Sequence, residues 1–114
     1  MTIGQIASIL NAKVLCGEEY LDTSVVSACG SDMMSDVLAC VKDQSVLLTG
    51  LVNPQAVRTA LMMDMKCVCF VRGKMPDEKV LDVARENGIV VLATEERMFS
   101  ACGKLYNAGV GGGL

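Results

Sequence analysis

One unit occurs three times in the second half of this chain: a short apolar run, a turn, and then an amphipathic helical pattern. The predicted strands that contain these runs begin at residues 45, 66 and 89, a spacing of about 22 residues. Strands that are apolar along their whole length are usually covered on both faces. Strand–helix units joined by short connections form parallel sheets with right-handed crossovers. The repeat therefore predicts a three-layer α/β fold, with a short and mostly parallel sheet over residues 45–107.

Capping residues predict where the three helices of this repeat begin and end. Asn53 can cap the first helix and Pro54 suits its first position, and we expect this helix to run to about Asp64. The second helix is predicted from the acidic turn at residues 76–78 to the stop signal at residues 87–88. The third follows residues 94–96, and its pattern places these apolar residues on one side: Met98, Phe99, Cys102, Leu105 and Tyr106.

The N-terminal third is predicted to add two helices and two short strands. Residues 2–11 have helical periodicity, with Thr2 and Gln5 spaced as a capping box. Residues 14–16 and 24–29 have strand character and end at glycines. A second helix is expected after a cap at Ser31 or Asp32. Its apolar positions are Met33, Met34, Val37, Leu38 and Val41.

Length and composition predict one domain. With 114 residues, of which 52% are hydrophobic and 20% charged, the chain can fill one core but not two. We assign residues 1–108 to this domain. The glycine-rich segment 109–114 is expected to be flexible or docked on a partner, with no core residue before Leu114.

The same composition excludes several classes of function. A net charge of −3 and 4% aromatic residues argue against a nucleic-acid partner. Because the chain has no His, the commonest general base and every Ser-His or Cys-His dyad are missing. It has neither a signal-peptide pattern nor a run of the ~20 apolar residues that spans a membrane. We therefore expect a cytoplasmic protein with reduced thiols and no membrane partner.

The strongest candidate site lies where the three predicted parallel strands end, because open α/β sheets bind ligands at that edge. Glycines there let backbone N–H groups approach a ligand, and two basic side chains suit a phosphate or carboxylate. The candidate ligand-binding residues are Thr49, Gly50, Arg72, Gly73, Lys74 and Thr94. Alternatively, the glycines only turn the chain and the basic residues are solvated, since no complete phosphate-loop motif is present. No residue is identified as catalytic.

Cysteine and hydrophobic content suggest two further hypotheses. Cys67 and Cys69 alternate on one strand and so share a face, where they could hold a metal or act in redox chemistry, or simply pack as small hydrophobes. The other cysteines are dispersed, and no Cys-x2-Cys spacing occurs. The high apolar content predicts an uncovered patch buried in a homodimer. Residues 33–41 and the C-terminal helix are the candidate contacts.

Several phrases of the sequence resemble a DRTGG domain. They are Val-Leu-Leu-Thr-Gly (46–50), Cys-Val-Cys-Phe-Val-Arg-Gly (67–73), Met-Pro-Asp (75–77) and Ile-Val-Val-Leu-Ala-Thr (89–94). The opening helix and residues 13–17 also resemble the start of such domains. The motif that gives the family its name would fall near residues 51–52 and 72–74. At these places only Gly50 and Gly73 correspond to it.

The resemblance implies a Rossmann-like fold, frequent dimerisation and a regulatory or assembly role. DRTGG domains occur within phosphotransacetylases and CBS-domain pyrophosphatases, resemble the N-terminal domain of HPr kinase/phosphorylase, and occur alone near iron-only hydrogenase systems. The leading hypothesis is a non-enzymatic regulatory or assembly module that forms a homodimer and needs no cofactor. Its expected ligand is a small anionic metabolite or nucleotide, and a larger enzyme of its pathway is a possible protein partner. One alternative is an enzyme-associated phosphotransfer or phosphate-ester-binding subunit. A second is a cysteine-based metal or redox accessory protein.

Overall fold

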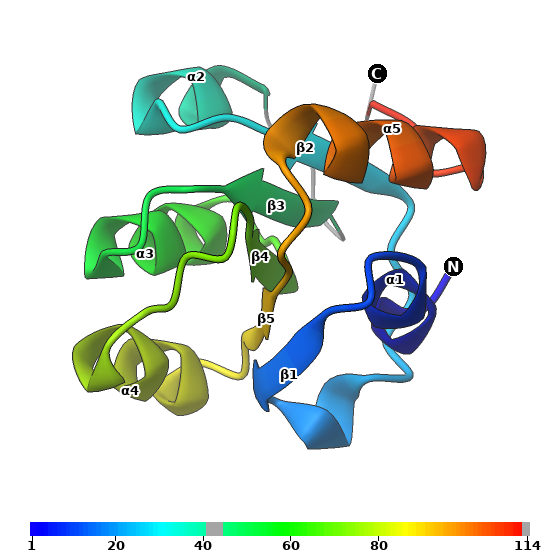
Figure 1. The fold of residues 1–114 in the computed structure, drawn as a ribbon. Coiled ribbons are helices and arrows are strands. Elements are labelled where there is room, and N and C mark those ends of the chain that lie inside the picture. The colour runs from blue at the N-terminus through cyan, green and yellow to red at the C-terminus, as the bar shows by residue number, and fades with distance from the viewer. Residues whose placement is uncertain (41–44, 113–114) are drawn as a thin grey trace.

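The computed structural model describes residues 1–40 and 45–112, and within them the chain forms one five-stranded sheet with helices on both faces (Figure 1). The strand order is β1-β5-β4-β3-β2. Four strands are parallel, and β1 (Lys13–Cys16) runs antiparallel to β5 at one edge. The parallel strands are β2 (Ser27–Gly30), β3 (Ser45–Thr49), β4 (Cys67–Phe70) and β5 (Val90–Ala93). The predicted mostly parallel sheet is confirmed.

The core consists of two layers separated by this sheet. One layer lies beneath α1 (Ile3–Ile9) and α5 (Met98–Asn107). The other lies beneath α2 (Met34–Cys40), α3 (Pro54–Met62) and α4 (Glu78–Glu86). All residues of β3, β4 and β5 are buried, as expected for strands covered on both faces. The predicted three-layer α/β architecture is therefore confirmed.

Local capping contacts fix the helix starts as predicted. In α1, the Thr2 hydroxyl accepts the Gln5 N–H at 3.1 Å and the Gln5 side chain accepts the Thr2 N–H at 2.8 Å. Asn53 caps α3 through the Gln55 N–H, with Pro54 in the first position. The Asp77 carboxylate caps α4 through the Val80 N–H at 3.2 Å. Each cap satisfies an N–H that has no partner within its helix.

The N-terminal third differs from its prediction in two places. The strand expected at residues 24–29 is β2, displaced toward the C-terminus, because Ser24 pairs with Thr2 and the Val25 N–H donates to the Met1 carbonyl. These contacts attach residues 24–25 to the start of α1 instead of to the sheet. A 3-10 turn, η1 (Glu18–Tyr20), follows β1 and was not predicted. Val41, an expected apolar position of the second helix, lies outside the described residues.

The predicted one-sided packing of the last helix is wrong for two aromatic residues. Ala101 and Leu105 of α5 are buried, whereas Phe99 is 91% and Tyr106 is 74% exposed. The expectation that no residue before Leu114 joins the core is also wrong. Val110 is buried, and Gly111 forms a parallel bridge with Ser27 of β2. Leu114 lies outside the described residues.

Across the described chain, every helix is too short and too polar to traverse a lipid bilayer.

Candidate functional site

The carboxyl ends of the parallel strands gather the predicted site residues at one edge of the sheet. Thr49 ends β3, Thr94 follows β5, and residues 72–74 follow β4. Because β1 is antiparallel to β5, its first residue, Lys13, also lies at this edge, where it pairs with Ala93. The edge therefore also holds groups that the strand-end pattern did not identify.

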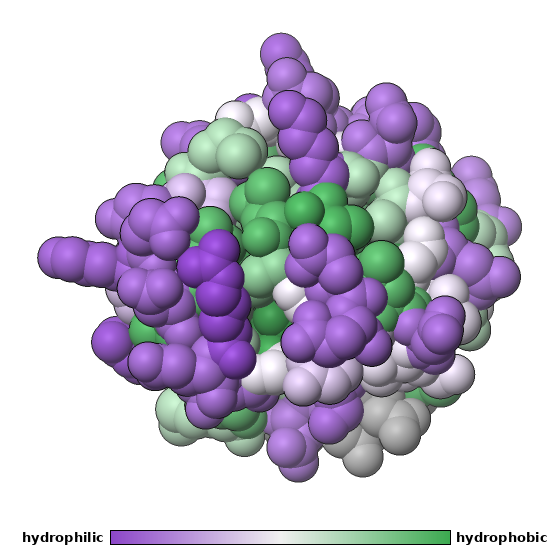
Figure 2. Space-filling model, turned by 90° about the horizontal axis from the view of Figure 1, so that it is seen from below, coloured by the Kyte–Doolittle hydropathy of each residue, from purple (hydrophilic) through white to green (hydrophobic). Residues whose placement is uncertain are grey.

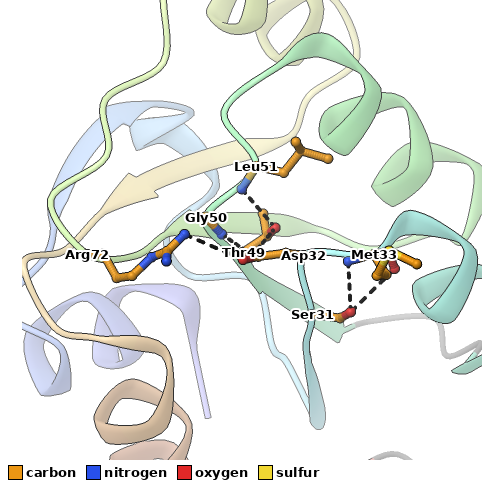
Figure 3. Close-up of polar contacts among 7 residues, drawn as sticks. All are labelled: Ser31, Asp32, Met33, Thr49, Gly50, Leu51 and Arg72. Atoms are coloured by element: carbon orange, nitrogen blue, oxygen red, sulfur yellow. Dashed lines mark hydrogen bonds and ion pairs between the residues drawn. The ribbon is translucent and has the colours of Figure 1, made fainter.

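Asp32, directly after β2, joins three of these segments (Figure 3). One carboxylate oxygen accepts the Gly50 N–H at 2.6 Å and the Thr49 hydroxyl at 3.2 Å. The other lies 3.4 Å from Nη2 of Arg72, and both side chains of this ion pair are about half exposed, at 46% for Arg72 and 50% for Asp32. Asp32, one of the two residues predicted to cap the second helix, therefore bonds to the strand ends instead. Ser31 closes that turn by accepting the Met33 N–H at 3.0 Å.

The two predicted threonines lie at the edge, but their hydroxyl groups serve the fold. Thr49 is buried, donates to Asp32 and accepts the Leu51 N–H at 3.1 Å. Thr94 is also buried, donates to the Leu10 carbonyl at 2.7 Å and accepts the Glu96 N–H at 3.2 Å. A hydroxyl has only one proton to donate, so neither threonine has a proton left for a ligand.

A tight turn follows β4 and presents the basic residues. Arg72 and Gly73 both have left-handed backbone, with φ of 62° and 70°. The Lys74 N–H closes the turn on the Val71 carbonyl at 3.2 Å, as in a type I′ turn. Two more hydrogen bonds, from the Arg72 N–H to the Glu96 carbonyl and from the Gly73 N–H to the Thr94 carbonyl, tie this turn to the loop after β5. A left-handed arginine is uncommon, and these contacts stabilise it.

Both site glycines lie directly beneath charged side chains. A Cβ atom at Gly50 would collide with the Arg72 guanidinium, and a Cβ atom at Gly73 would collide with the Glu95 carboxylate. The absence of a side chain at these two positions therefore lets Arg72 and Glu95 fold over the strand ends. The N–H groups of both glycines are bonded within the chain, that of Gly50 to Asp32 and that of Gly73 to the Thr94 carbonyl. The predicted approach of these N–H groups to a ligand stays a prediction.

A hollow of about 230 Å³ opens beside Gly73, between the β4–α4 turn and the start of β1. It is smaller than the ~300 Å³ at which pockets for drug-sized ligands begin, so it suits a small metabolite or one end of a larger one. Its lining mixes polar and apolar side chains: Asn11, Lys13, Gly73, Met75, Ala93, Thr94 and Glu95.

Apart from Thr94, the polar side chains around this hollow are unpaired. Within residues 1–40 and 45–112, no hydrogen bond or ion pair involves the side chains of Asn11, Lys13, Lys74 or Glu95. By contrast, Arg72 is paired with Asp32, and Lys104 is paired with Glu96. Two free ammonium groups and a free carboxylate are therefore available to a ligand at this edge.

Lys13, Asn11 and Glu95 were not among the predicted site residues, and neither was Asp32 as a site residue. Asn11 belongs to the turn after α1 and Lys13 begins β1, about 60 residues before Gly73 in the sequence. Only the antiparallel placement of β1 beside β5 brings them together. The local sequence could have identified Glu95 as an edge residue, since it follows the last predicted strand and precedes the first turn of a helix.

The predicted cysteine pair is buried in the core. Cys67 and Cys69 both face the layer under α1 and α5, which confirms that they share a face of β4. Burial raises the pKa of the Cys69 thiol to about 12 and raises that of Cys67 as well. Both groups are therefore protonated near neutral pH, whereas metal binding and nucleophilic chemistry need the thiolate. In the described part of the chain, no three His, Cys, Asp or Glu side chains cluster as metal ligands.

Comparison with known proteins decides the family. A family model described as the DRTGG domain matches residues 5–108, nearly the whole chain. The chain belongs to the DRTGG domain family. The two family-like glycines of the sequence, Gly50 and Gly73, are the ones that lie beneath Arg72 and Glu95.

A solved structure with the same fold is similar to this DRTGG domain. It is the crystal structure of the CBS and DRTGG domains of the regulatory region of Clostridium perfringens pyrophosphatase, complexed with its activator diadenosine tetraphosphate. The TM-score is 0.75 at 15% sequence identity, over 91% of this chain and 45% of that chain. The present chain thus spans less than half of that regulatory region. The search of curated protein sequences gave no match.

Proposed function

We propose that this DRTGG domain is a non-enzymatic regulatory module that binds a small anionic metabolite or nucleotide at the carboxyl edge of its sheet and acts as a homodimer. The domain of similar fold in the pyrophosphatase belongs to a regulatory region that was crystallised with a nucleotide activator. That relationship supports a regulatory role here. The identity of the ligand has to be argued from this chain's own side chains.

The observation that carries the proposal is the set of unpaired polar side chains around the hollow beside Gly73. Lys13 lines the hollow and Lys74 lies between two of its lining residues, so both ammonium groups can reach a phosphate or carboxylate. Glu95 and Asn11 can bind donor groups on the rest of the ligand. Arg72 lies next to Gly73, and its exposed half gives an anion a third cation, in competition with Asp32.

The same geometry argues against catalysis. Thr49 and Thr94, the two threonine hydroxyl groups at the strand ends, already donate their protons within the fold. The chain contains no His that could act as their base. Binding without chemistry therefore accounts for every side chain at the edge, whereas phosphotransfer would require Thr49 to leave its buried position.

Ligand binding is tested by thermal unfolding with ATP, diadenosine tetraphosphate, acetyl phosphate and inorganic phosphate as probes. A probe at 100 times its Kd adds about 2.7 kcal/mol to the stability, which raises Tm by roughly 10 °C in a domain of this size. We expect such a shift from at least one organic phosphate, and we expect Lys13→Ala and Lys74→Ala each to halve it or more.

Lys66→Ala is the matched control, because Lys66 is an exposed lysine at the opposite, amino edge of the sheet. It should leave the shift unchanged. If Lys66→Ala reduced the shift as much as Lys74→Ala, the effect would be one of net charge, and the site would be wrong. If no probe shifted Tm, the ligand class would be wrong.

The homodimer is supported by the amount of apolar side chain that the fold leaves outside. Phe99 and Tyr106 of α5 and Met33, just before α2, are each more than 60% exposed. A patch of large exposed apolar side chains on a small domain is typical of an interaction surface. Light scattering at micromolar concentration should give twice the 12.1 kDa mass of the chain, and a monomer mass over the whole concentration range would exclude the dimer.

A further inference from the structure

The outer face of α5 combines two exposed aromatic rings with an apolar hollow. Phe99 and Tyr106 are seven residues apart, two turns of the helix, and both point away from the core layer that Ala101 and Leu105 contact. One of only two phenylalanines in the chain is thus almost fully exposed. Neither ring contributes to the core, so the stability of the monomer does not explain their presence.

A shallow hollow of about 390 Å³ adjoins these rings. Its walls are mostly apolar, and they come from α5, β2 and the C-terminal segment: Ala28, Gly30, Phe99, Cys102, Gly103, Leu105, Tyr106, Val110, Gly111 and Gly112. The same surface therefore carries both projecting side chains and a cavity that can receive such side chains. A surface of this kind is self-complementary, which a two-fold symmetric contact requires.

We infer that two copies of the chain meet through this α5 surface, with Phe99 and Tyr106 of each copy packed into the hollow of the other across a two-fold axis. The inference rests on the homodimer proposed above and names its contact surface. Gly103 lies one turn from each ring on the helix, and no atom lies within 4 Å of the position that its Cβ would occupy. The helices of two copies can approach closely at this point.

The available area fits a stable dimer. Aromatic side chains bury about 150–250 Å² each, so four rings contribute roughly 600 Å² or more. A stable interface buries about 1,200–2,000 Å² in total. The remainder can come from other exposed side chains: Val26 just before β2, Met33 just before α2, and Leu38 of α2. Both α2 and α5 lie toward the β2 edge of the sheet, on its two faces (Figure 1).

Helix packing fits this end of the molecule better than strand pairing. The Ala28 N–H already donates to the Gly111 carbonyl at 3.0 Å, so the chain's own C-terminal segment covers part of the outer edge of β2. The opposite face of the molecule, toward β1 and α4, shows a strip of hydrophobic surface between hydrophilic side chains (Figure 2). No residue of β1 is among the large hydrophobic side chains that are clearly exposed, and Val14 and Leu15 are partly buried in the described chain. The aromatic ring on that face, Tyr20 of η1, is 44% exposed, well below the 91% of Phe99 and the 74% of Tyr106.

Sedimentation equilibrium of the full chain tests the interface with the variant Phe99→Glu/Tyr106→Glu. Because both side chains are exposed, we expect an unchanged circular dichroism spectrum and a dimer dissociation constant raised at least 100-fold. Met62→Glu is the matched control, since Met62 is 71% exposed at the end of α3, and it should remain dimeric. If the double glutamate variant lost its helical spectrum, Phe99→Ser/Tyr106→Ser would replace it, with at least a tenfold rise expected.

The two proposals fail in different ways. A wild-type chain that is monomeric throughout would overturn the homodimer and with it this interface. A wild-type dimer that the Phe99 and Tyr106 variants leave intact would overturn the interface alone. A dimer lost equally in Met62→Glu would also contradict the α5 assignment, because the contact would then not be specific to that helix.

Discussion

At the scale of single residues, Asp32 shows why part of the site could not be predicted. The sequence made Asp32 one of two candidates for a helix cap, a local role, because aspartate before an apolar helical pattern commonly caps it. Its partners are Gly50, 18 residues later, and Arg72, 40 residues later. Only the parallel pairing of β2 with β3 and of β3 with β4 brings these groups together. Arg72 was predicted correctly as an edge residue, but its ion pair was not.

Asp32→Asn should lower the free energy of unfolding by roughly 1–2 kcal/mol, because hydrogen bonds to a charged acceptor are stronger than those to a neutral amide. The ion pair between Asp32 and Arg72 is half exposed, so it contributes little to this loss of stability. Urea unfolding at pH 7 measures the change. Asp22→Asn is the control, since Asp22 is exposed and should change stability by less than about 0.5 kcal/mol. Equal effects of the two variants would mean that Asp32 does not hold the strand ends together.

At the scale of elements, the sequence was most informative where burial is complete. The strands β3, β4 and β5 are buried throughout and mostly apolar, and capping residues mark α3 and α4, so their positions were predicted to within two residues. The edge strands β1 and β2 are short and partly exposed, so their sequences constrain them less. In α5 the apolar pattern contains two stripes, one facing the core and one facing outward. Hydropathy alone cannot distinguish a core stripe from a contact surface, and the aromatic residues were therefore misplaced.

The buried thiols of β4 predict a specific dependence of stability on pH. The pKa of Cys69 is raised by burial from 9.0 to about 12, so the unfolded chain loses this proton at lower pH than the folded chain. Stability from this group is fully present below pH 9 and falls as the pH rises from 9 toward 12. The expected slope approaches about 1.4 kcal/mol per pH unit for each such thiol.

Urea unfolding of wild type and Cys69→Ala between pH 7 and 10.5 measures this dependence. The variant is expected to be less stable at pH 7, because it loses buried volume. Its stability should fall less steeply than that of the wild type above pH 9, since one titrating thiol is gone. Parallel pH profiles would show that Cys69 is not buried in its protonated form.

At the scale of the whole molecule, the three-layer fold places its two proposed functional surfaces at different ends of one sheet. The carboxyl edge holds the unpaired lysines and the hollow beside Gly73, and α5 carries the aromatic surface beside β2. The order of the central strands, and therefore the location of the edge, followed from the repeated strand–helix unit. The contribution of Lys13 and Asn11 to this edge could not be predicted from the repeat, because it depends on an antiparallel edge strand formed near the start of the chain.

The central claim is that this DRTGG domain binds an anionic metabolite at the carboxyl edge of its sheet. A titration followed by two-dimensional ¹H–¹⁵N NMR tests it directly, with diadenosine tetraphosphate, ATP and inorganic phosphate as probes. The account predicts the largest chemical-shift changes with the probe that raises Tm most. They should fall on the backbone amides of residues 11–13, 72–75 and 94–96, with little change at Lys66 and Gly88 on the amino edge. Largest shifts at the amino edge, or none with any probe at millimolar concentration, would contradict it.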